Sequence, residues 1–194
     1  MSYIRLEKDA DGIVELIFDQ DGKSVNVMGD EYAEAMPKAL DELEAQKGEI
    51  TGVYIRSGKP GQFFAGGDIT LMLEMDLHPD DVERKQMLDG IIAAKAPLRR
   101  LEALGVPIAV GINGAALGGG FEIALACHHR IALDDKRVQI GLPEAMLGLM
   151  PGAGGIVRMV RLLGMQDALT LISQGKRLNA SRAIEKGLIH ELAA

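Results

Sequence analysis

Short stretches of alternating apolar and polar residues are interleaved along this chain with longer stretches in which apolar residues recur every three or four positions. The first pattern is typical of strands with one buried face, and the second of helices packed against a core. The clearest helical face carries Tyr32, Met36, Leu40 and Leu43. The patterns predict strands at 3–8, 12–18, 51–57, 107–112, 129–132 and 138–140, and helices at 30–46, 80–104, 121–127, 156–163, 166–173 and 180–186.

Because strands alternate with helices, the predicted fold class is α/β with a largely parallel sheet. Asp30 stands where the N-terminal cap of one helix is expected, and Asp80 starts a second, longer helical pattern. Pro97 interrupts the longest helical pattern. Proline lacks the N–H that an interior helical residue donates, so we expect a kink or a break at this position.

The chain has 194 residues, enough for one domain with a buried core, and we predict a single domain over 1–194. Its last residues, 188–194, have the pattern of a strand that has just been completed. This ending predicts that the sequence is a fragment of a longer chain.

Composition narrows the class of protein. Hydrophobic residues make up 47% and charged residues 25% of the chain, as in ordinary globular proteins. The net charge of −7 argues against nucleic acid or an anionic membrane as a partner. The single cysteine, Cys127, lies in an apolar run and is expected to be a buried thiol in a reducing compartment. There is neither a secretory leader pattern nor a run of about 20 apolar residues, so we expect a cytoplasmic protein.

Candidate chemistry begins at three consecutive glycines, Gly118–Gly120, which lie between the predicted strand 107–112 and Glu122. Glycines let backbone N–H groups approach a ligand, and the first N–H groups of a helix lack intrahelical partners. Such donors beside an acid can stabilise an oxyanion while a proton moves. Glycines after a strand also serve close packing, which stays open as an alternative. The turn 63–68 has the same ambiguity, and its Asp68 is expected to cap the helix that follows.

Two glutamates lie among apolar residues. The neighbours of Glu122 within 121–127 are all apolar, so its carboxylate needs a partner or a raised pKa. An ion pair with Arg130 or His128 is the alternative interpretation. Glu144 follows Pro143 and precedes another apolar run. The alternative to a functional role for Glu144 is that of an acid placed at the start of a helix.

The sequence gives no support for a metal site, a phosphate-binding loop or a covalent nucleophile. His128 and His129 are adjacent, so their side chains diverge, and no ligand-type residues flank them at a useful spacing; we expect no metal site. The sequence has no Gly-x4-Gly-Lys-Ser/Thr phosphate loop. It also lacks a motif for a covalent nucleophile.

Five motifs, taken together and in this order, resemble the crotonase family of enoyl-CoA hydratases and isomerases. They cover nearly the whole chain, and the nearest resemblance is to the N-terminal hydratase/isomerase domain of the bifunctional fatty-acid oxidation complex. The resemblance implies a crotonase-like fold of repeated ββα units in two roughly perpendicular sheets surrounded by helices, here without the family's C-terminal helices. The motifs are Lys-Ser-Val-Asn at 23–26, Ala-Gly-Gly-Asp-Ile at 65–69, Asn-Gly-Ala-Ala-Leu-Gly-Gly-Gly at 113–120, Pro-Glu at 143–144 and Pro-Gly-Ala-Gly-Gly at 151–155.

The resemblance also implies acyl-CoA substrates, no cofactor apart from the coenzyme A of the substrate, and no metal. Its oxyanion hole corresponds to the backbone N–H groups of Gly67 and Gly119, and its two catalytic acids to Glu122 and Glu144. The residues that would bind coenzyme A are Lys23, Ser24, Val25, Ala65, Gly66, Asp68 and Ile69. Thr70 stands where many relatives have lysine, which weakens one phosphate contact.

Because both glutamates are present, the resemblance favours an enoyl-CoA hydratase of fatty-acid β-oxidation, which adds water across the 2,3 double bond of 2-enoyl-CoA. Glu144 would donate the proton to C2, and Glu122 would orient and activate water. The alternatives are a Δ3-Δ2 enoyl-CoA isomerase, typical of members that keep only the second glutamate, and a non-catalytic CoA-binding fragment. The family further implies a homo-oligomer, a trimer or hexamer, or a place in a multifunctional β-oxidation complex.

Overall fold

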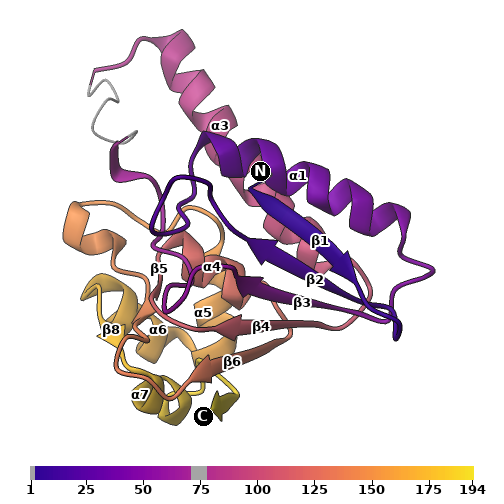
Figure 1. Cartoon of the computed structure of the whole chain (residues 1–194). Helices are drawn as coiled ribbons and strands as arrows, with labels where there is room; N and C mark the ends of the chain where they lie inside the picture. Colours follow the sequence, from indigo (N-terminus) through magenta and orange to yellow (C-terminus); the bar gives the residue numbers. More distant parts are fainter. Residues whose placement is uncertain (1–2, 71–77) are drawn as a thin grey trace.

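The computed structural model describes residues 3–70 and 78–194, and it confirms an α/β fold with a largely parallel sheet. The larger sheet has six strands in the order β1-β2-β3-β4-β6-β9 (Figure 1). Only β1 pairs antiparallel to its neighbour; the other neighbouring strands pair parallel. The strands are β1 (Ile4–Lys8), β2 (Ile13–Phe18), β3 (Gly52–Ser57), β4 (Ile108–Ile112), β6 (His129–Leu133) and β9 (Glu191–Ala193).

A smaller sheet of three strands has the order β5-β7-β8. Its strands are β5 (Ala116–Leu117), β7 (Ile140–Gly141) and β8 (Arg177–Leu178). Periodicity did not predict β5 or β8, because two residues are too short to show alternation, and β7 lies slightly later than the predicted strand 138–140. An isolated bridge between Phe64 and Ala116 places β5 beside the loop after β3.

The core lies between one face of the larger sheet and the helices α1 (Asp30–Ala45) and α3 (Asp81–Glu102) (Figure 1). Register brings Val14 beside Val53 and Leu16 beside Ile55, and all of these side chains are buried. The four residues of the predicted face of α1 are buried as well. An edge-to-face contact joins Phe18 of β2 to Phe64, with ring centroids 5.3 Å apart.

The starts of the two long helices, α1 and α3, differ in how they are capped. Asp80 caps α3: its side chain accepts from the N–H groups of Val82 and Glu83, and Glu83 completes the capping box. The prediction for Asp30 was wrong, because Gly29 occupies the capping position in an extended conformation and Asp30 is the first helical residue. Pro97 does not split α3. The residue four positions before it, Ala93, is exposed, so water can solvate the carbonyl that loses its partner.

The remaining helices surround the smaller sheet and the loops after the strands. They are α4 (Gly119–Leu125), a 3-10 turn η1 (Glu144–Leu147), α5 (Gly155–Leu163), α6 (Met165–Ser173) and α7 (Ala180–Glu185). Every residue of α4 is buried, as the apolar run around Glu122 predicts. Cys127 is buried too, and this burial raises the pKa of its thiol to about 12. Among the helices of residues 3–70 and 78–194, none has the length and hydropathy to cross a membrane.

Candidate active site

Three motifs of the predicted site lie on segments that follow the carboxyl ends of parallel strands. The loop 19–28 follows β2, the loop 58–68 follows β3, and the loop 113–118 follows β4 and leads into α4. Ligands of open parallel sheets bind at this edge, because the loops of neighbouring strands meet there. The fold therefore brings together three of the five sequence motifs.

Asn26 joins two of these loops to the ends of two strands. Its Nδ2 donates to the carbonyl oxygens of Phe18 and Phe63, at 3.2 and 2.9 Å, and to the Ser57 hydroxyl at 3.0 Å. Its Oδ1 accepts from the N–H of Gln20 at 3.0 Å. The Asn26 side chain is fully buried, so these bonds fix the loop 19–28 against the loop 58–68.

The two predicted oxyanion donors lie on adjacent turns. A short parallel bridge to Met28 uses the carbonyl of Gly66 and the N–H of Asp68, so the N–H of Gly67 lies outside that pairing. Gly119 is the first residue of α4, and its N–H has no intrahelical acceptor. A Cβ on Gly66 would lie 3.0 Å from the Leu117 carbonyl oxygen and 3.9 Å from the Cα of Gly118. The two glycine turns are therefore in contact, as a two-donor site requires.

Glu122 is held by backbone donors. The N–H groups of Ala153 and Gly155 both donate to its Oε1, at 2.8 and 2.7 Å. The side chain is only 2% exposed. Burial raises the pKa of Glu122, against the opposing effect of the two N–H donors and of the charges of Arg158 and Lys95.

The alternative partners of Glu122 are not in contact with it. Arg130 donates instead to the carbonyl oxygens of Leu188 and Cys127, both at 2.8 Å. His128 accepts the N–H of Ile108 through its Nδ1 at 3.1 Å. Both side chains serve the local structure around β6.

Glu144 is the first residue of η1, so the interpretation of an acid at a helix start describes its position correctly. Its environment is nevertheless unusual. Oε2 is buried and has no hydrogen-bond partner among the described residues. Burial, together with the nearby charge of Glu122, raises the pKa of Glu144 to about 7, although a backbone N–H opposes this. Glu144 is therefore a carboxyl group that can give or take a proton near neutral pH.

Gly118 connects the two acids. Its φ is 52° and its ψ −126°, a combination that residues with a side chain rarely adopt. A Cβ at this position would lie 2.9 Å from Oε1 of Glu144. The turn that starts the helix of Glu122 thus passes directly beside the carboxyl group of Glu144.

The predicted coenzyme A residues form two neighbouring segments. Ala65 N donates to Asn26 O at 2.9 Å, and Met28 N donates to Gly66 O at 2.7 Å, so residues 26–28, which directly follow 23–25, run beside 65–68. Asp68 caps the helical residues Ile69 and Thr70 as predicted, since its Oδ1 accepts from Thr70 N at 2.9 Å. Exposure differs along the segments: Lys23, Ser24, Ala65 and Ile69 are exposed, Val25 and Asp68 are half-buried, and Gly66 is buried.

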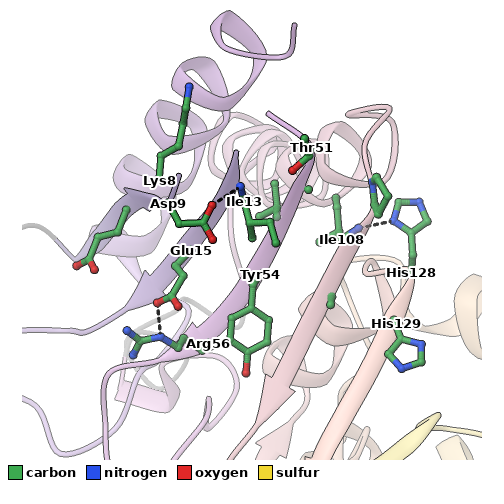
Figure 2. A pocket seen from close by; sticks show the side chains of 15 residues that line it. Lys8, Asp9, Ile13, Glu15, Thr51, Tyr54, Arg56, Ile108, His128 and His129 are labelled. Carbon is green, nitrogen blue, oxygen red and sulfur yellow. Dashed lines mark hydrogen bonds and ion pairs between the residues drawn. The ribbon is translucent and has the colours of Figure 1, made fainter. Parts of the chain in front are cut away.

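A broad hollow of about 890 Å³ lies elsewhere, at the amino ends of the parallel strands (Figure 2). Its lining includes Ile13, Gly52 and Ile108, each the first residue of its strand. Several charged groups in it are paired, as with Arg56 and Glu15 at 2.7 Å. None of the predicted site residues lines this hollow.

Sequence reasoning assigned no role to three residues that surround Glu122. Ala153 and Gly155 belong to a recognised motif, but their donation to Oε1 depends on a fold that brings residues 31 and 33 positions away beside Glu122. Arg158 binds this same loop. The available signal was the glycine content of the loop before a helix. Glycines leave the N–H groups at a helix start accessible, and such N–H groups are suitable partners for a buried carboxylate.

Comparison with known proteins defines first the class and then the family. The chain superposes on a crystal structure of an enoyl-CoA hydratase from Bacillus anthracis with a TM-score of 0.86 and 28% identity, covering 98% of this chain and 70% of that one. An enoyl-CoA hydratase from Thermoplasma volcanium shows the same fold, with a TM-score of 0.86, 24% identity, and coverage of 100% and 72%. The fold is therefore that of the crotonases.

A family model described as enoyl-CoA hydratase/isomerase matches residues 9–194. The chain belongs to this family. It is 39% identical over 189 residues to a fatty acid oxidation complex subunit alpha from Idiomarina loihiensis and 36% identical over 187 residues to one from Shewanella frigidimarina. Each match covers 96% of this chain and 25% of the relative, so the chain spans about a quarter of the length of these curated relatives.

Proposed function

We propose that this chain is an enoyl-CoA hydratase that adds water across the 2,3 double bond of 2-enoyl-CoA thioesters in fatty-acid β-oxidation. The observation that carries the proposal is the unequal pair of acids beside two glycine turns. Glu122 is buried but receives two N–H donors, whereas Glu144 has an unpartnered oxygen and a pKa of about 7. Hydration needs two acids in different protonation states, which this pair can supply.

In the proposed reaction, the N–H groups of Gly67 and Gly119 bind the thioester oxygen. Glu122 takes a proton from water as the water oxygen forms a bond to C3, and the electrons of the double bond move toward the thioester oxygen. Glu144 then gives its proton to C2, which restores the carbonyl and completes the addition. Each N–H donor is expected to contribute about 2.7–4 kcal/mol to stabilising the oxyanion.

Coenzyme A would lie along the segments 23–25 and 65–69. The support is a pair of backbone hydrogen bonds that holds the residues directly after 23–25, Asn26 and Met28, beside the second segment. Lys23, the cation of these segments, is exposed and can reach a phosphate group. We also propose that the protein is cytoplasmic. We propose further that it assembles as a homo-oligomer or within a larger β-oxidation complex.

The direct test is hydration of crotonyl-CoA by the purified chain, followed as loss of the enoyl absorbance. We expect turnover by the wild type and a loss of about 10²–10⁴-fold in kcat for Glu144→Gln. Glu185→Gln is the matched control, because this residue is exposed at the end of α7. Absence of turnover by the wild type, with retained binding of a CoA thioester, would instead favour a non-catalytic CoA-binding role.

An enoyl-CoA isomerase is the second candidate. The observation in its favour is Glu144 itself, because a single carboxyl group with a pKa of about 7 can take a proton from one carbon and return it to another. This reaction needs no activated water. It therefore assigns no chemical step to Glu122, and the two functions differ in their dependence on that residue.

A further inference from the structure

The geometry points to Arg158 as a positioning residue for Glu122, acting through the loop 151–155. The inference rests on the proposed function, because it assigns Arg158 a part in keeping Glu122 ready to activate water. Among the described residues, Arg158 forms no direct hydrogen bond with Glu122 or Glu144. Its role follows from two sets of contacts: Arg158 binds the backbone of the loop 151–155, and that loop donates hydrogen bonds to Glu122.

Arg158 lies on α5 and holds the loop that precedes this helix. Its Nη1 donates to the carbonyl oxygen of Ala153 at 2.7 Å, while the N–H of Ala153 donates to Oε1 of Glu122 at 2.8 Å. Ala153 is thus bound on one side by Arg158 and on the other by Glu122. A shift of the Ala153 carbonyl would move the adjoining N–H that supports Glu122.

Two neighbouring glycines make this arrangement possible. Gly154 has a φ of 97°, and a Cβ there would lie 2.5 Å from Nη1 of Arg158. A Cβ on Gly155 would lie 2.9 Å from both Cγ and Oε1 of Glu122. The loop backbone therefore packs against the guanidinium group at one glycine and against the carboxylate at the next, with no side chain to separate them.

Arg158 is itself anchored to a different part of the fold. Its Nε donates to Oε1 of Glu102, the last residue of α3, at 2.8 Å. The Arg158 side chain is only 10% exposed and that of Glu102 22% exposed. Burial alone would raise the pKa of Glu102, but the hydrogen bonds and charges of Arg158 and Arg99 outweigh it and lower the pKa. A fixed, charged pair thus connects α3 to the loop.

This arrangement directs both backbone donors to Oε1 of Glu122. Among the described residues no donor binds Oε2, so that oxygen is the one available for a water molecule. The positive charge of Arg158 also favours the ionised form of Glu122, which is the form that can accept a proton. Arg158 therefore acts on Glu122 in two ways, by geometry and by charge.

The test compares Arg158→Gln, Arg158→Lys and Arg161→Gln in hydration of crotonyl-CoA. Arg161 is the matched control because it lies on the same helix and is exposed. It lines a second, smaller hollow together with Arg158 and Glu102 but has no hydrogen bond to the loop among the described residues. We expect Arg158→Gln to lower kcat about 100-fold with little change in KM, because a misplaced catalytic group costs rate rather than binding. The acid limb of its pH–kcat profile should move to higher pH. Arg158→Lys should lower kcat about tenfold and keep the limb in place, because it retains the charge. Arg161→Gln should match the wild type.

The titration of the Glu122 carboxyl, followed by carbon NMR, separates this inference from the proposed function. Arg158→Gln should raise the pKa of Glu122 whether or not the chain hydrates crotonyl-CoA. If the wild type does not hydrate crotonyl-CoA but Arg158→Gln still raises the pKa of Glu122, the hydratase proposal is wrong and the positioning role of Arg158 is supported. The inference is overturned if folded Arg158→Gln keeps the wild-type kcat and titration, or if Arg161→Gln has an equal effect. Should Arg158→Gln fail to fold, Arg158→Lys decides: a wild-type kcat overturns the role, and a tenfold loss restricted to kcat supports it.

Discussion

The surroundings of Glu122 and Glu144 differ although the two side chains are chemically identical. Glu122 lies in the middle of a buried helix and is supported by two N–H groups from a distant loop. Glu144 lies at the start of a 3-10 turn, and one of its oxygens is buried without a partner among the described residues. The structure stabilises the carboxylate form of the first acid more than that of the second.

This comparison teaches that burial alone does not determine the protonation state of an acid. Burial raises the pKa of both groups. At Glu122 two N–H donors of a distant loop and the charge of Arg158 oppose the rise, whereas at Glu144 only its own backbone N–H does. Two acids with the same intrinsic chemistry can then take different parts in one proton transfer.

The largest expected effect breaks the comparison directly. Glu122→Gln should abolish hydration, with kcat falling about 10²–10⁴-fold, because the amide cannot accept a proton from water. Conversion of a 3-enoyl-CoA to the 2-enoyl isomer should persist, since that reaction depends on Glu144 alone. The two rates are measured on the same protein with the two substrates.

Glu144→Gln is the counterpart of this experiment, and it should remove both reactions. Equal loss of hydration and isomerisation in Glu122→Gln would contradict the separation of roles. It would mean that the two carboxyl groups work as one coupled unit.

A smaller effect is expected from alanine at the glycines beside each acid. Gly155→Ala places a methyl group 2.9 Å from Cγ and Oε1 of Glu122, whose buried helix cannot yield. We expect a loss of about 1–3 kcal/mol in the free energy of unfolding from overpacking, and of about 100-fold in kcat from displacement of the carboxylate. Chemical denaturation and crotonyl-CoA hydration measure the two.

Gly118→Ala tests the other acid, where the methyl group meets the tip of Glu144 and the backbone has a positive φ. Its backbone strain is expected to cost about 1–3 kcal/mol. Two matched controls separate strain from contact. Gly148→Ala has a φ of 71° but open space, whereas Gly152→Ala has open space and no positive φ. If Gly148→Ala lowered kcat as much as Gly118→Ala, contact with Glu144 would not be the cause.

The smallest effect concerns stability against pH. The pKa of Glu144 rises on folding from 4.5 to about 7, so the folded state binds more protons than the unfolded state between these values. Stability contributed by this group is therefore present below pH 4.5 and lost as pH rises through about 7. Glu144→Gln removes this dependence, and its Tm relative to the wild type should be higher at pH 8 than at pH 5. A constant Tm difference between the two pH values would contradict the assignment.

Periodicity predicted the long elements because a buried face imposes its pattern on the sequence. The strands β1 to β4 and the helix α1 illustrate this, since their core residues recur with the expected spacing. Short strands such as β5 and β8 escaped because their pairing depends on neighbours in space rather than on their own sequence. Of the kink or split expected at Pro97, the split is absent, because an exposed helix can hydrate a carbonyl that loses its partner.

The candidate site divides in the same way. A buried acid among apolar residues is visible in the sequence, and so are the glycine turns at Gly67 and Gly119. The partner of that acid is not visible, since many segments could supply two N–H groups. Only the fold selects Ala153 and Gly155, and sequence reasoning had considered Arg130 and His128 instead. The roles of the two acids and of the coenzyme A segments stay predictions.

The contacts that surround Glu122 have a consequence for a nascent polypeptide. They join residues 33 positions apart between Glu122 and Gly155, and 56 positions apart between Glu102 and Arg158. Closing such distances costs chain entropy, which the contacts must offset once both segments have been made. A ribosome-bound polypeptide that has emerged only as far as Leu149 already carries both acids but not the backbone that steadies one of them. The backbone support of Glu122 is therefore complete only after Gly155 has been synthesised.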